Sequence, residues 1–271
     1  TRKESSAASD VYKRQVGANP KLFANNAIKI HIDIDPYELK EENGVKTHLK
    51  INEDLKIFIP KLKIILKKIS IDKNWYSKIY DWKKKYPIIQ KKYFKEKNYT
   101  NPYIFFRKLS ETCKKNYVIV NDASANLVWS YQSFIAKKGQ KIFTALNHSP
   151  MGYSIAASIG ASLAEPKKKI IVIIGDGSVP MNVQELENIK NLNLPIYIFI
   201  INNSGYGMIK QTLNTWLKGN YVGCDKKSGL SLPNYKNIFN SYGIKSTEIN
   251  TNDEIGIKSV SYTHLTLPTT P

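Results

Sequence analysis

Two apolar runs constrain the fold of this 271-residue chain more than any other feature. Residues 170–174 read Ile-Ile-Val-Ile-Ile, and residues 196–201 read Ile-Tyr-Ile-Phe-Ile-Ile. Both runs are rich in β-branched residues and lack the alternation of a half-exposed strand, which is typical of parallel strands covered on both faces. We therefore expect an α/β fold, with a doubly wound, mostly parallel sheet flanked by helices.

Polar residues follow each of these two strands. Gly175-Asp176-Gly177-Ser178 follows the first, and Asn202-Asn203 follows the second. Ligands of open α/β sheets bind at the carboxyl ends of the strands. Asn203 lies 27 residues after Asp176, about one strand–helix–strand unit, so both side chains could reach one Mg²⁺ ion, which prefers oxygen ligands. A Gly-Asp-Gly sequence alone is more often an ordinary turn; the two strands, the spacing and the glycine-rich turn after Asn203 together favour a site.

This pattern, with Gly-Tyr-Gly-Met at residues 205–208, resembles the thiamine diphosphate motif of the acetolactate synthase and pyruvate decarboxylase superfamily, and most closely that of acetolactate synthase large subunits. The resemblance covers roughly residues 20–258. It implies a thiamine diphosphate-binding fold for residues 99–258, truncated at its end. It also implies that residues 16–70 are the tail of a second, central α/β domain and that residues 71–98 form a linker helix between the two.

The resemblance also assigns the site residues. It places the Mg²⁺ ligands at Asp176, the side chain of Asn203 and the carbonyl of Gly205. The predicted cofactor-binding residues are Ser124, Asn126, Ser149, Met151, Gly175, Gly177, Ser178 and Met208. In the family, the methionine matching Met151 is the wedge that holds the cofactor bent, and Trp129 and Gln132 are also in register with the diphosphate loop.

The residues themselves support part of this assignment. Residues 121–126 follow a predicted strand at 117–120 and run into a predicted helix, so the free N–H groups and the helix dipole could bind an anion. A plain N-cap explains Ser124 or Asn126 equally well when each is judged alone. His148 could act as a general acid or base, but a loop histidine without chemistry is the simpler interpretation. Residues 221–232 are either a mobile lid or a plain surface loop.

By resemblance, the expected activity is decarboxylation of pyruvate and transfer of the two-carbon unit to a second 2-oxo acid, a transferase or lyase reaction of branched-chain amino acid biosynthesis. Thiamine diphosphate and Mg²⁺ are the expected cofactors, and FAD stays open. The family's catalytic Glu belongs to a domain that corresponds to nothing here, so we assign no catalytic residue, regard the chain as a fragment, and expect it to be inactive alone. A homodimer or homotetramer is expected at full length.

Two departures leave the substrate open: Ser154-Ile155-Ala156 and Gln211-Thr212 replace the family's usual Gly-Leu-Pro and Gln-Trp. One alternative is therefore a 2-oxo acid decarboxylase or a related lyase. A more remote one is a non-catalytic phosphate-binding α/β module, although the chain lacks the G-x-x-x-x-G-K-[ST] and G-x-G-x-x-G motifs.

Composition bounds the remaining possibilities. The net charge is +19, but the lysines are scattered in short groups, so we expect solvated surfaces and no nucleic-acid partner. No run of eighteen apolar residues occurs and the two cysteines lie far apart, so we expect no membrane partner, reduced thiols and a cytoplasmic location. Residues 1–15 and 259–271 differ in composition from the rest and are predicted to be non-native tails outside the fold.

Two patterns concern the region before residue 71. Alternation over residues 27–35 predicts a strand with its isoleucines on one buried face, and apolar residues at helical spacing over 55–69 predict an amphipathic helix capped by Asn52 and kinked at Pro60.

Overall fold

The computed structural model describes residues 22–40, 45–67, 70, 72–146, 148–255 and 264–268. The chain forms two compact units, which divide between Lys85 and Tyr86. Each unit has its own parallel sheet, one of two strands and one of six.

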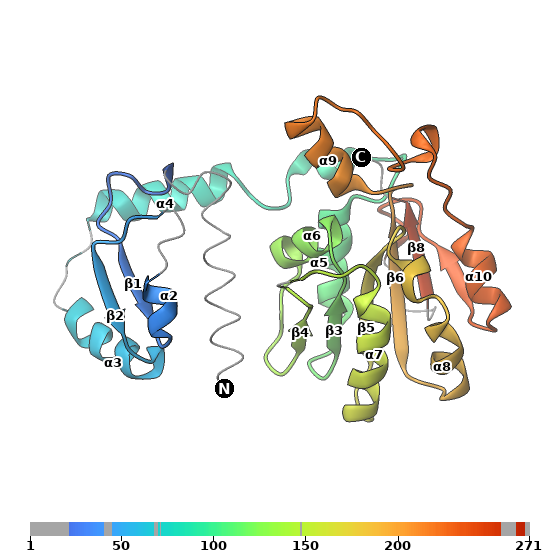
Figure 1. The fold of residues 1–271 in the computed structure, drawn as a ribbon, viewed down its shortest axis with the longest axis horizontal. Coiled ribbons are helices and arrows are strands. Elements are labelled where there is room, and N and C mark those ends of the chain that lie inside the picture. The colour runs from blue at the N-terminus through green and yellow to red at the C-terminus, as the bar shows by residue number, and fades with distance from the viewer. Residues whose placement is uncertain are drawn as a thin grey trace. The chain divides into compact units, whose positions relative to one another are not determined.

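The first unit pairs β1 (Ile30–Asp33) in parallel with β2 (Leu49–Asn52), and Figure 1 labels its helices α2 (Pro36–Lys40), α3 (Leu55–Leu66) and α4 (Lys73–Lys85). Asp54 caps α3 by accepting from the Lys56 amide at 2.8 Å, so the predicted cap at Asn52 is wrong. Asn52 instead donates its side-chain amide to the carbonyl of Asp33 at 2.9 Å, which ties the two strands together.

The predicted buried isoleucine face of β1 is also wrong. Ile30 is 55% exposed, whereas Asp33 on the opposite face is buried. The Asp33 carboxylate accepts from the Asp35 amide at 2.8 Å, so a turn holds this side chain inside. In the described part of this unit, the two-stranded sheet leaves the isoleucine face largely uncovered.

The second unit has a six-stranded sheet in the order β4-β3-β5-β6-β8-β7, and every neighbouring pair is parallel. The strands are β3 (Val118–Asn121), β4 (Lys141–Phe143), β5 (Ile170–Gly175), β6 (Ile196–Asn202), β7 (Ser246–Glu248) and β8 (His264–Pro268). The predicted doubly wound parallel sheet is thereby confirmed. The central pair, β5 and β6, is formed by the two apolar runs.

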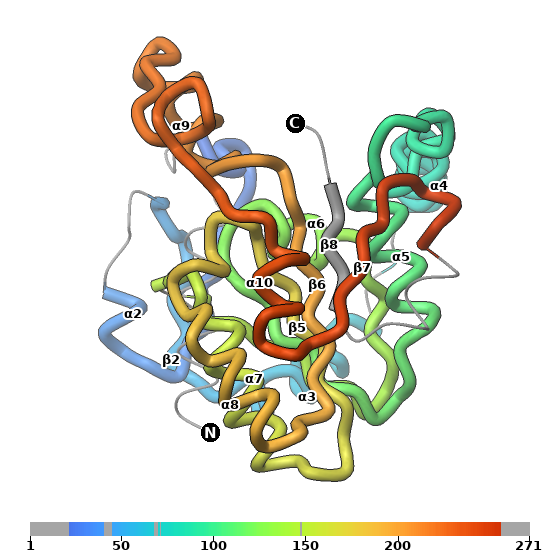
Figure 2. The backbone as a smooth tube through the Cα atoms, turned by 90° about the vertical axis from the view of Figure 1, so that its right-hand side faces the viewer, coloured from blue at the N-terminus to red at the C-terminus, as the bar shows by residue number. Residues whose placement is uncertain are grey.

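Helices cover both faces of this sheet. Ile170, Val172 and Ile174 pack into a core with α7 (Tyr153–Ala164), α8 (Glu185–Asn191) and α10 (Tyr235–Ser241), while Ile171 and Ile173 pack on the other side with α5 (Pro102–Thr112) and α6 (Ala125–Ser133). Figure 2 shows α7, α8 and α10 on one side of the strands and α5 on the other. Because both faces of the sheet are buried, the sequences of β5 and β6 do not alternate between apolar and polar residues.

The remaining helical segments are α9 (Gly207–Trp216) and three 3-10 turns, η2 (Lys91–Lys95), η3 (Val179–Asn182) and η4 (Lys226–Ser228). Asn101 caps α5 by accepting from the Tyr103 amide at 3.1 Å, and Pro102 occupies the first helical position, where its missing N–H is not needed.

Residues 259–271 are predicted to lie outside the fold, and this is wrong for His264–Pro268. These residues form β8, which pairs with β6 on one side and β7 on the other. On the edge of β6 that faces away from β5, this pairing gives the backbone N–H and C=O groups hydrogen-bond partners. Whether this segment is native to the protein stays a prediction.

No helix in the described ranges is both long and apolar enough to cross a bilayer.

Candidate functional site

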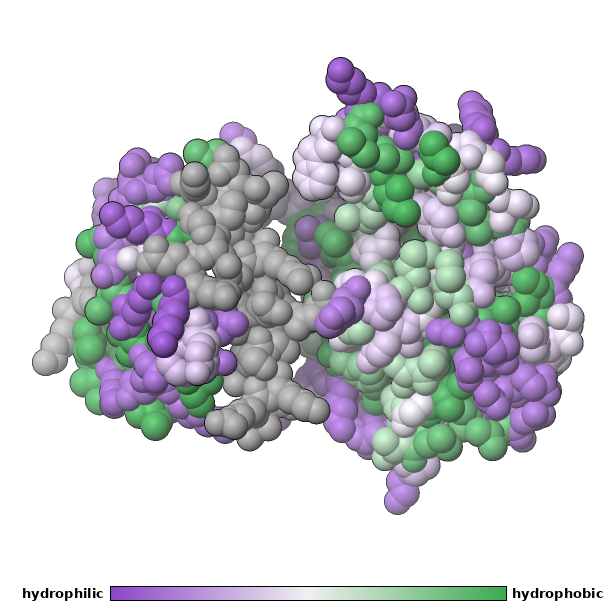
Figure 3. All heavy atoms as spheres, in the orientation of Figure 1, coloured by the Kyte–Doolittle hydropathy of each residue, from purple (hydrophilic) through white to green (hydrophobic). Residues whose placement is uncertain are grey.

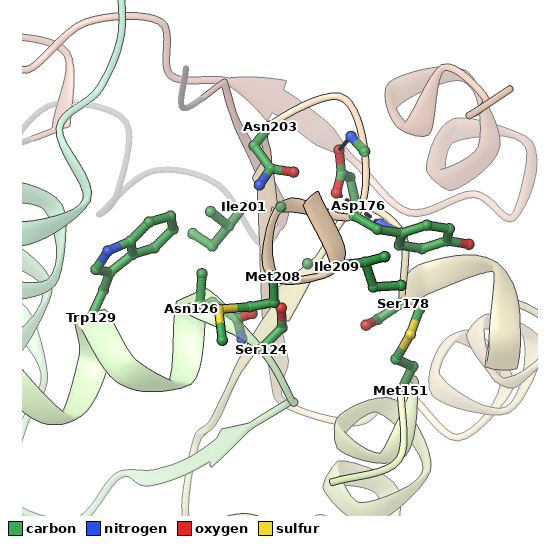
Figure 4. Close-up of a pocket in the computed structure, with 16 residues that line it drawn as sticks. Ser124, Asn126, Trp129, Met151, Asp176, Ser178, Ile201, Asn203, Met208 and Ile209 are labelled. Carbon is green, nitrogen blue, oxygen red and sulfur yellow. Dashed lines mark hydrogen bonds between the residues drawn. The ribbon is translucent and has the colours of Figure 1, made fainter. Parts of the chain in front are cut away.

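A pocket lies at the carboxyl edge of the large sheet, where β3, β5 and β6 run into loops and helices (Figure 4). It holds about 460 Å³ of space that is continuous with solvent. Its lining comes from the loop after β3, the turn before α7, the loop after β5 and the turn between β6 and α9. The lining residues are Ser124, Ala125, Asn126, Trp129, Met151, Gly175, Asp176, Gly177, Ser178, Ile201, Asn203, Gly205, Tyr206, Gly207, Met208 and Ile209.

Most of the predicted site residues meet in this pocket. All three predicted Mg²⁺ ligands and seven of the eight predicted cofactor residues line it. The exception is Ser149, which is exposed and donates its amide to the Ala145 carbonyl at 2.7 Å. Its assignment stays a prediction. Gln132 and His148 are also exposed and lie outside the lining set.

The Asp176 carboxylate lies at the centre of the site and is only 2% exposed. Its Oδ1 accepts from the Gly177 amide at 2.8 Å, and its Oδ2 accepts from the Gly205 amide at 3.1 Å. Burial raises its pKa to about 6, and the surrounding backbone N–H groups offset this only in part. The site therefore holds a carboxylate whose charge the protein itself does not neutralise.

The side-chain amide of Asn203 completes a cluster of polar atoms around this carboxylate. One end of the amide lies 2.6 Å from the carbonyl oxygen of Gly205 and 3.2 Å from Asp176 Oδ1. If this end is the nitrogen, it donates to both oxygens. If it is the oxygen, three oxygens converge with no hydrogen between them, at separations close to the roughly 3 Å expected between neighbouring ligands of one small octahedral cation. The residues thus fit the predicted cation.

This ligand set contains a single carboxylate. Among the described residues, no group of three or more His, Cys, Asp and Glu side chains could hold a metal ion. A cation at Asp176 would instead depend on amide and carbonyl oxygens, and on oxygens of a phosphorylated ligand.

Two helices present their N-termini to the pocket. Ala125 and Asn126 begin α6, and Gly207 and Met208 begin α9; all four residues line the pocket. No side chain caps either helix, so their first N–H groups are left to other acceptors. Helix N-termini carry partial positive charge and bind phosphate groups. This geometry supports anion binding beside Asp176.

Two residues with a positive φ lie in the same loops. Ser124 has φ of 81° and Ser204 has φ of 59°, a region that non-glycine residues seldom adopt. Such conformations cost about 1–3 kcal/mol each and cluster at binding sites.

Asp122 is a site residue that the sequence analysis misses. Its carboxylate is fully buried and accepts from the Gly152 amide at 3.2 Å and from the Ser154 amide at 2.9 Å. These bonds join the end of β3 to the start of α7 and so fix the turn that carries Met151 into the pocket. A carboxylate directly after a buried strand is the signal that could have identified it.

Tyr206 lines the pocket and is tied to the segment after α9. A Cβ on Gly177 would lie 2.2 Å from Tyr206 Cε1, so the tyrosine ring packs directly against this glycine. The Tyr206 amide donates to the Cys224 carbonyl at 2.9 Å, and Lys210 forms an ion pair with Asp225 at 2.8 Å. The hydrogen bond from Lys210 contributes most to lowering the pKa of Asp225 to about 2. Residues 221–232 are thus fastened to the site.

The other side of the pocket is apolar. Trp129, Ile201, Met208 and Ile209 line it, with Met208 and Ile209 partly exposed to solvent. Figure 3 shows apolar side chains gathered on the surface in the region of α9. In Figure 4, Trp129 lies at one end of the pocket and Met151 and Ser178 at the other.

Fold and site together define a doubly wound α/β protein with a pocket at the carboxyl ends of its strands that suits an anionic ligand. Comparison with known families identifies the group more closely. Residues 122–259, about half of the chain, match the family described as thiamine pyrophosphate enzyme, C-terminal TPP binding domain. The chain therefore belongs to the thiamine pyrophosphate enzyme family, as the sequence motif predicts.

Curated relatives are acetolactate synthases. The chain is 32% identical over 242 residues to the acetolactate synthase large subunit of Cyanidium caldarium, a match covering 87% of this chain and 40% of that protein. It is 32% identical over 237 residues to the large subunit of Lactococcus lactis, covering 87% and 40%. A third relative, acetolactate synthase 1, chloroplastic, of Oryza sativa, is 28% identical over 244 residues, covering 87% and 37%. The chain spans about two fifths of the length of these relatives.

The raised pKa of Asp176 predicts a pH-dependent stability when no cation is bound. Because the folded pKa of about 6 exceeds the usual 3.8, the folded state binds this proton more tightly, and that stabilisation is lost as pH rises through about 6. With EDTA present, the free energy of unfolding of the wild type, relative to that of Asp176→Asn, should fall by about 3 kcal/mol between pH 3.5 and pH 7.5. Urea unfolding monitored by circular dichroism measures this, and a pH-independent difference would contradict it.

The packing of Tyr206 against Gly177 predicts that the glycine tolerates no side chain. Gly177→Ala should displace the Tyr206 ring and reduce thiamine diphosphate binding at least tenfold, because a Cβ would lie 2.2 Å from the ring. Gly160→Ala is the matched control: a Cβ there meets nothing within 4 Å. It should leave binding unchanged and stabilise α7 by up to about 1 kcal/mol. Calorimetric titration checks both variants, and wild-type binding by Gly177→Ala would contradict the packing argument.

Proposed function

We propose that this chain is part of a thiamine diphosphate- and Mg²⁺-dependent enzyme that acts on 2-oxo acids, most closely of the acetolactate synthase type. The observation that carries the proposal is the convergence of Asp176, Asn203 and Gly205 on one point, beside two helix N-termini, in the segment that matches the family. A cation and a diphosphate need these two features side by side.

Each part of the pocket has a role in this proposal. Asp176, the Asn203 side chain and the Gly205 carbonyl hold Mg²⁺. Ser124, Asn126 and the N-terminus of α6 contact the diphosphate, and Gly175, Gly177 and Ser178 let the backbone approach it closely. The proposed contact of Ser149 is through its backbone carbonyl.

The apolar residues shape and dry the site. Met151, in the turn before α7, and Met208, on α9, enter the pocket and would contact the rings of the cofactor. Trp129, Ile201 and Ile209 give one end of the pocket an apolar surface, which would strengthen electrostatic interactions there once a bound ligand displaces the water. Thiamine diphosphate, when bound, supplies a nucleophilic carbon and an electron sink. The chain itself contributes anchoring, orientation and a low dielectric.

Acetolactate synthase chemistry is the preferred activity because the matched relatives carry that name. We propose decarboxylation of pyruvate and transfer of the two-carbon unit to a second 2-oxo acid, in branched-chain amino acid biosynthesis, by a homodimer or homotetramer. A cytoplasmic location stays a prediction, and one matched relative is named chloroplastic. FAD binding stays open.

A decarboxylase or related lyase is the alternative. The departures at 154–156 and 211–212, positions that border the pocket in the family, keep it open. Product analysis separates the two activities. With pyruvate as sole substrate, the assembled enzyme should release acetolactate, whereas acetaldehyde as the main product would favour the decarboxylase. The resemblance places the activating Glu in a domain that matches no part of these residues, so the chain alone should bind cofactor without turnover.

Asp176→Ala tests the proposed metal site. The variant should lose Mg²⁺-dependent binding of thiamine diphosphate, because it removes the only carboxylate among the proposed ligands. Calorimetric titration with and without Mg²⁺ measures this. Glu165→Ala, which breaks ion pairs with Lys141 and Lys168 outside the pocket lining, is the control and should retain Mg²⁺-dependent binding. Unchanged binding by Asp176→Ala would remove the assignment.

A further inference from the structure

Tyr235 contacts the site from a helix that contributes no residue to the pocket lining. It is the first residue of α10, and only 3% of its surface is exposed. Its ring belongs to the apolar core on the α7 side of the sheet. Its hydroxyl donates to the backbone carbonyl of Asp176. A residue 59 positions away in sequence therefore holds the main chain at the central carboxylate.

The structure fixes Asp176 at each of its polar groups. Its backbone amide donates to the Ile201 carbonyl on β6 at 3.0 Å. Its carbonyl accepts from Tyr235, and its carboxylate accepts from the amides of Gly177 and Gly205. The orientation of the carboxylate is therefore set by three separate segments.

The bond from Tyr235 is coupled to the orientation of the carboxylate. The carbonyl oxygen of Asp176 and the N–H of Gly177 belong to the same planar peptide group. That N–H donates to Asp176 Oδ1 at 2.8 Å. The C=O and N–H of a trans peptide point in opposite directions within this plane, so holding the carbonyl also aims the N–H at the carboxylate. Without the hydroxyl, the peptide plane is free to rotate and Oδ1 loses its fixed donor.

The chemistry of the tyrosine suits this role. A tyrosine hydroxyl carries a hydrogen that it can donate to a carbonyl oxygen. A phenylalanine would fill the same space and leave the carbonyl without this donor.

We propose that Tyr235 is a positioning residue that orients the Asp176 carboxylate for a divalent cation. Its effect on the cation is indirect and passes through the peptide group between Asp176 and Gly177. The inference rests on the proposed Mg²⁺ and thiamine diphosphate site. It adds that the Tyr235 hydroxyl contributes to cation binding beyond any contribution to the stability of the fold. Groups that orient metal ligands in this way typically change metal affinity by about 10–100-fold when removed.

The test compares Tyr235→Phe with Tyr242→Phe in the cofactor-binding protein. Tyr242 follows α10 and packs partly buried against the same core, so it controls for loss of a hydroxyl there. Calorimetric titration of thiamine diphosphate at increasing Mg²⁺ gives the Mg²⁺ concentration for half-maximal binding. This value should rise about tenfold in Tyr235→Phe and stay at the wild-type value in Tyr242→Phe. Saturating Mg²⁺ should restore binding to Tyr235→Phe.

Thermal unfolding in EDTA, measured on the same samples, separates positioning from stability. If Tyr235→Phe lowers the unfolding temperature but keeps the wild-type Mg²⁺ requirement, the residue is structural and the inference is overturned. If the wild type itself shows no Mg²⁺-dependent binding of thiamine diphosphate, the proposed function fails, and the positioning role fails with it. The first of these two outcomes leaves the proposed function standing, and the second does not.

Discussion

A carboxylate buried at the end of a central strand is the constraint on which the site depends. Asp176 is almost fully enclosed, and backbone N–H groups alone do not return its pKa to the usual range. Burying a charge without a partner is costly, so such groups either bind a proton or pair with a cation. The side-chain amide of Asn203 and the carbonyl of Gly205 lie beside this carboxylate. With the oxygen of that amide turned toward Asp176, the proposed cation would complete the group.

The parallel sheet makes this convergence possible. The carboxyl ends of β3, β5 and β6 lie at one edge, so loops more than 50 residues apart in sequence share a pocket. Helices that start just after these strands also begin at that edge, which brings two N-termini beside one carboxylate. The negative carboxylate attracts a cation, and the partly positive helix N-termini attract a diphosphate. A metal–diphosphate pair fits the electrostatics better than either ion alone.

Much of this was accessible from the sequence because the signals are local. The unbroken apolar runs identify β5 and β6, and the spacing of Asp176 and Asn203 identifies the edge where they meet. The orienting groups were not accessible, because Asp122 and Tyr235 act through backbone atoms of distant segments. A motif states which residues touch a ligand, but it does not state what holds them.

The errors have the same physical origin. Alternation in residues 27–35 correctly marks β1, but burial depends on what covers the strand, and Ile30 is exposed in the described part of its unit. Composition sets residues 259–271 apart, yet strand pairing depends on backbone groups that every residue except proline carries in full, and β6 accepts His264–Pro268 as a neighbour. Composition therefore carries little information about which segment pairs with an open strand.

The site is held together by the fold and is not self-supporting. Ser124 and Ser204 adopt strained backbone conformations, and Asp176 carries an unneutralised charge, so each of these residues lowers the stability of the empty protein. The sheet core, buried on both faces, provides the stability that offsets these costs. A ligand that binds only the folded state returns stability according to its affinity and concentration. The charge at Asp176 is the part of this cost that the proposed cation would relieve, whereas the backbone strain at Ser124 and Ser204 is offset by the core.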